Sequence, residues 1–160
     1  MEIPPPRGTL RPVASPLSHP AFEPVDISVG QRVVLLWRVW TTAARIRLLM
    51  RHPIADVVTR LDVPGGRTPT ATALLSRAVS RGLRIGPWRP RCLLRSLVLY
   101  RLLREQGDEA ELVIGLPDRA KSPDAHAWVE LDGRDVGPWP GRKGYEVLTR
   151  YPRPTVTLDP

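Results

Sequence analysis

One stretch of the chain, residues 90–107, combines a helical pattern with clear start and stop signals. Its apolar positions recur at the spacing of one helical face: Leu94, Leu97, Val98 and Leu102. Pro90 precedes the pattern and Gly107 follows its last polar turn, where these two residue types favour helix ends. The stretch therefore predicts a core helix in the middle of the chain, and the rest must pack around it.

Cys92, the only cysteine of the chain, falls in the first turn of this predicted helix. The unpaired N–H groups of a first turn and the helix dipole stabilise negative charge. Arg91 and Arg95 stand beside the cysteine and act in the same direction. We therefore expect the thiol to ionise more readily than a free one. The alternative is a small, buried apolar residue at the start of a core helix.

The preceding residues predict three more helices. Residues 28–51 form the longest, with Ser28 as N-cap. Its proposed core face contains nine residues: Val33, Val34, Leu36, Trp37, Trp40, Ala44, Ile46, Leu48 and Leu49. We interpret it as a core helix whose arginine stems reach to water, with a membrane-surface helix as the alternative. Residues 54–61 predict a short helix, and Thr68-Pro69 start another that runs to Gly82.

The two ends of the chain are rich in proline. Seven of the 19 prolines lie in residues 1–28, and proline keeps such a segment from forming a long helix. We expect residues 1–28 to be an extended arm, residues 29–150 a single domain, and residues 151–160 a proline-rich tail.

The pattern changes period after Gly107. Residues 110–116 are apolar and β-branched, which predicts a strand, and residues 125–131 alternate as a second strand. Asp132-Gly133 is a strong hairpin signal, with a return strand over residues 134–136. Residues 145–148 predict a last edge strand or a docked turn. The predicted fold class is α+β, with a helical N-terminal half packed on a small antiparallel sheet.

His126 begins the second predicted strand, on the same face as Trp128 and Glu130. A cysteine on a helix and a histidine on a strand are the parts of a thiol hydrolase, because the imidazole takes the thiol proton and later returns a proton to the leaving amine. The alternative is an ordinary strand histidine. The indole of Trp128 is placed to shield the imidazole from water.

These motifs resemble a known family. CLLRSLVL from Cys92, LLREQG from Leu102, ELVIG from Glu111 and AHAWVELDG from Ala125 are similar to the C-terminal domain of the microcin-processing B proteins of lasso peptide biosynthesis. The resemblance covers residues 85–136 and extends over the helices from 30 to 82. It implies a transglutaminase-like or papain-like cysteine peptidase that removes the leader from a ribosomally made precursor. It also implies cleavage after a leader end with threonine at its penultimate position.

The resemblance assigns Cys92 as nucleophile and His126 as general base and acid. The family places an acidic residue about a dozen positions after the histidine, to hold the imidazole tautomer, and Pro138 occupies that position here. Asp135, on the return strand, is the candidate substitute, with Asp124 or a backbone carbonyl as alternatives. An exposed hairpin residue is the other interpretation of Asp135. The backbone N–H of Cys92 is the expected oxyanion donor.

The net charge of the chain indicates which class of partner to expect. The net charge is +8, carried almost entirely by arginines spread along the helices, without a zinc-ligand spacing, a phosphate loop or an RNA-binding motif. We expect a cytoplasmic enzyme without a cofactor, without a membrane span and without specific nucleic-acid binding. The expected partners are an acidic leader peptide, a separate leader-recognition protein, because no fused recognition module is recognisable, and the lasso cyclase.

Two other functions remain open at this stage. One is acyl transfer on the same scaffold, as in a transglutaminase or N-acyltransferase, in which an amine replaces water. The other is a non-catalytic peptide-binding module, which the proline at the usual acidic position favours.

Overall fold

The computed structural model describes residues 27–66, 68–84, 91–117, 125–138, 141–142 and 144–152. The predicted arm and tail, the connector 85–90 and Asp124 lie outside these residues, apart from Ile27, Ser28, Tyr151 and Pro152. The helices are α1 (Val29–Leu49), α2 (Ile54–Leu61), α3 (Thr72–Gly82) and α4 (Cys92–Arg104). The strands are β1 (Ala110–Pro117), β2 (His126–Leu131), β3 (Arg134–Gly137) and β4 (Tyr145–Tyr151).

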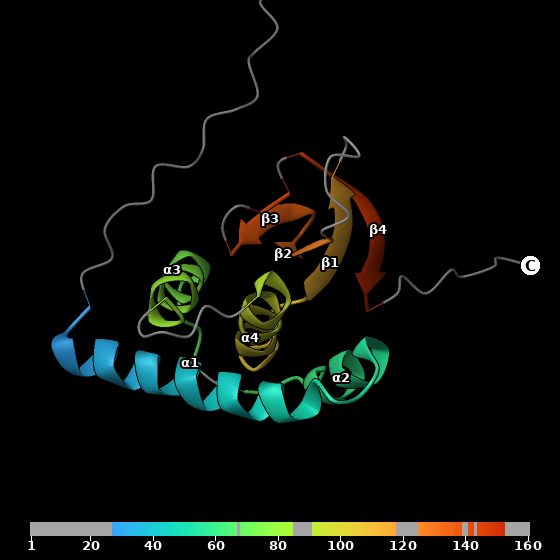
Figure 1. The fold of residues 1–160 in the computed structure, drawn as a ribbon. Helices are drawn as coiled ribbons and strands as arrows, with labels where there is room; N and C mark the ends of the chain where they lie inside the picture. The colour runs from blue at the N-terminus through green and yellow to red at the C-terminus, as the bar shows by residue number, and fades with distance from the viewer. Residues whose placement is uncertain are drawn as a thin grey trace, which may run out of the picture.

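The architecture is α+β, as predicted: four helices pack on a four-stranded antiparallel sheet of order β3-β2-β1-β4 (Figure 1). Helix α4 lies between the sheet and the other helices, touching β1 and β2 on one side and α1, α2 and α3 on the other. Eight of its residues are buried: Leu94, Ser96, Leu97, Val98, Leu99, Tyr100, Leu102 and Leu103. The predicted central helix is therefore confirmed.

Polar groups of α4 also fix its neighbours. The Nη1 of Arg101 donates to the carbonyls of Leu61 and Val63, at 3.0 and 2.9 Å. These carbonyls lie at and just beyond the C-terminus of α2, where the helix itself supplies no partner. Arg101 thus caps α2 and holds it against the central helix.

Helix α1 begins where the sequence predicts, but its buried face is a different one. Ser28 and Gln31 form a reciprocal capping box. The buried residues are Leu35, Val39, Ala43 and Ile46, so of the nine residues of the proposed core face only Ile46 is buried. Trp37 is 71% exposed. The prediction was wrong because α1 has apolar residues on two opposite sides, and periodicity does not tell which side meets α4.

Helix α3 starts at Thr72 and not at Pro69. The side-chain amide of Gln106 accepts from the backbone N–H of Thr70 and donates to its carbonyl, at 2.9 and 3.0 Å. Both backbone groups of Thr70 are thereby bonded outside any helix. The predicted helix start at Thr68-Pro69 is therefore wrong, although the predicted end at Gly82 is confirmed.

The order of the strands in the sheet depends on one hairpin and on the pairing of β4 with β1. Asp132 and Gly133 both have positive φ, 50° and 71°, and form the predicted hairpin turn between β2 and β3. Strand β4 pairs with β1, so the chain crosses from one edge of the sheet to the other between residues 137 and 145. Leu112, Ala127 and Val129 belong to the core shared with the helices.

The described part of the chain has neither a membrane-spanning helix nor a cluster of metal ligands. None of its helices is long and apolar enough to cross a membrane. None of its side chains form a cluster of three or more potential metal ligands.

Candidate thiol site

The first turn of α4 lies against the start of β2. The Cys92 thiol donates to the carbonyl of Ala125 at 3.8 Å, and the Ser96 hydroxyl donates to the carbonyl of Ala127 at 2.7 Å. Four helical residues advance about 6 Å and two strand residues about 6.7 Å. The helix and the strand therefore run side by side in the same direction, which brings Cys92 to the end of the sheet where His126 begins β2.

Cys92 is half-buried and has a cation one turn away. Burial and the charge of Arg84 lower the pKa of Arg95, whereas the charge of Cys92 raises it. The guanidinium of Arg95 is thus close enough to Cys92 for the two charges to interact. Its buried Nε has no hydrogen-bond partner among the described residues. The sequence expectation that arginine accompanies the thiol is met by Arg95.

The ring of His126 lies on the face of the sheet opposite α4. Ala127 and Val129 point to the helices, so His126 and Trp128 point away from them. The imidazole lies 6.2 Å from the Trp128 ring in a stacked arrangement and 4.8 Å from the Tyr145 ring, both measured between centroids. The predicted shielding by Trp128 is thus present. The thiol reaches the carbonyl before His126, and its one described hydrogen bond is to that carbonyl and not to the imidazole.

Burial controls the protonation of His126. The residue is 7% exposed. Burial lowers the pKa of His126 below its ordinary 6.5, while the charge of Asp135 raises it and that of Arg95 lowers it. Among the residues that the structure describes, the buried Nε2 atom has no hydrogen-bond partner. The lowered pKa of His126 favours the neutral imidazole, the state that a proton-accepting base requires.

Two later residues, Asp135 and Pro138, bear on whether the imidazole of His126 has an acidic partner. Pro138, which the resemblance expects to be acidic, is a buried proline. The Asp135 carboxylate accepts from the backbone N–H groups of Gly137 and Arg142, at 2.8 and 2.6 Å. Asp135 thus organises the turn after β3 and acts on His126 through its charge.

A buried carboxylate positions the tryptophan. The indole Nε1 of Trp128 donates to Glu130 at 2.9 Å, and Arg150 pairs with the other oxygen of Glu130 at 2.6 Å. Gly115, on the central strand, leaves space for the indole, because a Cβ there would lie 2.8 Å from the ring. The glycine lets rings from β2 and β4 meet across β1.

Tyr145 is the site residue that sequence reasoning missed. It is the first residue of β4 and pairs with Pro117, two residues beyond Gly115, which pairs with His126. The residue was assigned only to an edge strand or turn, because its neighbour in the fold depends on β4 pairing with β1. The available sequence signal for this contact was an aromatic residue at the start of one predicted strand together with a glycine, Gly115, in another.

The described residues include a half-buried thiol at a helix start, a guanidinium one turn away, and a buried imidazole directly after the carbonyl that the thiol contacts. The imidazole ring itself lies on the other face of the sheet. Such a set can supply a sulfur nucleophile and a proton acceptor. Neither the comparison with curated proteins nor the comparison with solved structures finds a match. A family model described as the transglutaminase-like superfamily matches residues 38–150. This match spans α1 to β4 and includes both Cys92 and His126, so the chain belongs to the transglutaminase-like superfamily.

Proposed function

We propose that this protein is a cysteine peptidase that removes the leader from a ribosomally made lasso peptide precursor before macrocyclisation. The observation that carries the proposal is the 3.8 Å contact between the Cys92 thiol and the carbonyl of Ala125, the residue before His126. Membership of a superfamily of thiol enzymes supports it. The net charge of +8 suits an acidic leader or recognition protein.

In the proposed reaction, His126 accepts the thiol proton and the Cys92 sulfur attacks the carbonyl carbon of the scissile peptide bond. The backbone N–H of Cys92 stabilises the oxyanion. Collapse of the tetrahedral intermediate breaks the C–N bond, and the imidazolium gives its proton to the leaving amine. Water then hydrolyses the thioester, releasing the leader carboxylate and restoring the thiol.

In the structure the thiol contacts a backbone carbonyl and the imidazole lies on the other face of the sheet. The reaction therefore requires both side chains, Cys92 and His126, to turn towards each other at the end of β2 when substrate binds. Tightening of catalytic hydrogen bonds in the substrate complex is common. Asp135 acts in the proposal through its charge on His126 and not through a direct hydrogen bond.

The test is precursor cleavage followed by mass spectrometry, with the separate recognition protein present. Cys92→Ala and His126→Ala should each lower the cleavage rate by about 10³-fold or more. His52→Ala is the matched control, because His52 is exposed in the turn after α1 and should leave the rate unchanged.

The products decide between the possible outcomes. Free leader and free core peptide, lost with Cys92→Ala, support the peptidase. A leader ligated to an added amine would replace the proposal with acyl transfer. Normal cleavage by Cys92→Ala would refute the assignment of the nucleophile, and tight precursor binding without any product would leave a binding module.

A further inference from the structure

The outer side of α1 is apolar and exposed. Of the large hydrophobic residues exposed in the described structure, five lie along this side of the helix at spacings of three, four and eight residues: Val29, Val33, Trp37, Trp40 and Leu48. We call these five residues the α1 outer face. At 100° per residue they lie about 130° around the helix from the buried residues. The side of α1 that faces away from α4 is not covered by another described helix or strand (Figure 1). A contiguous exposed apolar stripe of this kind marks an interaction surface.

The charges that α1 itself carries all have one sign. Helix α1 contains Arg32, Arg38, Arg45 and Arg47 and has no acidic residue. At 100° per residue, Arg47 lies at one edge of the stripe, and Arg38 and Arg45 lie on the other flank. Arg32 lies at the same angle as the buried residues of the helix. The helix therefore presents an apolar stripe between two cationic borders.

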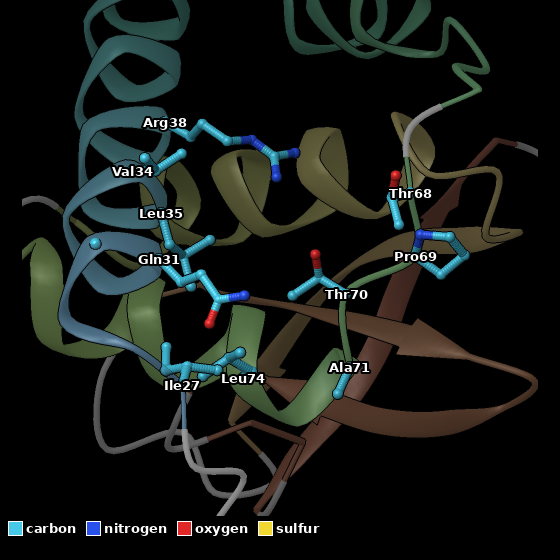
Figure 2. Close-up of a pocket in the computed structure, with 11 residues that line it drawn as sticks. Ile27, Gln31, Val34, Leu35, Arg38, Thr68, Pro69, Thr70, Ala71 and Leu74 are labelled. Carbon is cyan, nitrogen blue, oxygen red and sulfur yellow. The ribbon is translucent and has the colours of Figure 1, made fainter.

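Two hollows follow one another along the Arg38 flank. The first has a volume of about 540 Å³ and lies between α1 and the segment before α3, with Val34 and Gln31 on one wall and Thr70 on the other (Figure 2). The second, of about 240 Å³, is lined by Trp37, Thr41 and Arg45. Arg38 lines both, so together they form a track along the helix.

The acidic group in this track is already paired. Glu105 lines the second hollow and lies 3.4 Å from Arg38 and 3.1 Å from Arg101. Two cations thus surround one carboxylate. The balance of the track remains positive, which favours an acidic ligand.

We propose that the α1 outer face and its two hollows form a docking site for an acidic polypeptide segment that carries large apolar side chains. The apolar side chains of the segment pack on Trp37 and enter the hollows, and its carboxylates lie against Arg38 and Arg45. This is recognition of a peptide by an apolar groove with charged borders. The proposal does not rest on the peptidase activity, since none of these residues touches Cys92 or His126.

Two other occupants fit less well. A second copy of the chain would place one arginine-bordered helix against another, and like charges facing each other repel. An anionic bilayer would match the tryptophans and arginines. However, a bilayer surface does not fill two separate hollows beside the helix, whereas side chains of a polypeptide do. An acidic polypeptide satisfies the apolar stripe, the charge and the hollows together.

The experiment selects ligands for the full chain from a random-sequence peptide display library and measures binding of the enriched peptides by fluorescence anisotropy. Enriched peptides should be acidic and carry at least one aromatic or large aliphatic residue. Trp37→Ser should weaken their binding about tenfold or more, the effect of losing one well-buried large apolar contact. Arg45→Glu should weaken it too, and binding should fall from low to moderate salt.

Matched controls sit elsewhere on the surface. Leu148→Ser on β4 removes a hydrophobic residue that is 63% exposed, close to the 71% of Trp37. Arg60→Glu makes the same charge change on an exposed position of α2. Both controls, and Cys92→Ala, should bind the selected peptides like the natural chain, which separates docking from catalysis.

Each remaining outcome overturns the proposal. Enriched peptides that are neutral or basic, or that bind Trp37→Ser normally, would place the site elsewhere. Phosphatidylglycerol vesicles that bind in a Trp37-dependent way without any peptide binding would make the face a membrane contact. Dimerisation lost with Trp37→Ser would make it a self-interface. Failure to enrich any Trp37-dependent peptide would mean that the face does not receive an acidic segment.

Discussion

The ion pair between Glu130 and Arg150, next to Trp128, offers the sharpest test of the packing on the sheet face that carries His126. Glu130 is 1% exposed and accepts from the indole of Trp128 and from Arg150. Arg150→Met removes the cation and leaves the long apolar stem in place. The carboxylate of Glu130 then remains buried with the neutral indole as its one described partner.

The expected cost can be estimated from the burial of the two partners. Removing one member of a fully buried pair costs about 3–5 kcal/mol, because the other charge is left without compensation. The Arg150 side chain is 29% exposed, so water reaches the vacated position and screens the carboxylate. We therefore expect Arg150→Met to lower the free energy of unfolding by about 2–3 kcal/mol. The melting temperature should fall by about 4–12 °C for a chain of this size.

The assay is a double-mutant cycle followed by urea denaturation with circular dichroism and tryptophan fluorescence. Glu130→Gln removes the charge and keeps an oxygen for the indole. In that background Arg150→Met should cost less than about 1 kcal/mol. Glu111→Gln is the control, because Glu111 also pairs with Arg150, at 2.9 Å, but is 35% exposed. Its effect should stay within about 1 kcal/mol.

Additive effects of Glu130→Gln and Arg150→Met on the free energy of unfolding would refute this reasoning. If Arg150→Met costs the same with Glu130 and with Gln at that position, the pair does not compensate a buried charge. A loss with Glu111→Gln as large as that with Arg150→Met would show instead that the exposed pair carries the energy.

Three further predictions concern the site. Gly115→Ala should destabilise the fold by about 1–3 kcal/mol and change the Trp128 fluorescence, because the added Cβ would lie 2.5 Å from the carbonyl oxygen of Glu146 and 2.8 Å from the indole ring; an unchanged unfolding midpoint in urea would contradict this. Ser96→Ala should cost about 1–3 kcal/mol by leaving the buried carbonyl of Ala127 without its 2.7 Å donor, whereas equal stability would mean that the carbonyl has another partner. Burial lowers the pKa of His126, so the unfolded chain binds a proton at this residue more readily than the folded chain does. Its contribution to stability is therefore present above pH 6.5 and is lost as the pH falls below that value. His126→Gln should remove this loss of stability in thermal melts between about pH 5 and 7, and an identical pH profile in the variant would contradict the burial of a neutral imidazole.

The sequence by itself determined most of the local structure. Capping at Ser28, the helix over residues 54–61, the helix that starts at Cys92 and the turn at Asp132-Gly133 depend on neighbouring residues, and all four are present in the structure. The α+β class followed from the change of period, and the motifs around Cys92 and His126 led to the superfamily. Such features are readable because their physical causes lie within a few residues along the chain.

Only the tertiary structure decided which faces meet. Helix α1 has two apolar sides, and packing on α4 buries Leu35 and leaves Trp37 exposed. Gln106 delays the start of α3 by holding Thr70, a contact across 36 residues. Pairing of β4 with β1 brings Tyr145 to the imidazole. Each of these depends on contacts between segments that are distant in sequence, and local patterns do not encode which distant partner a surface will find.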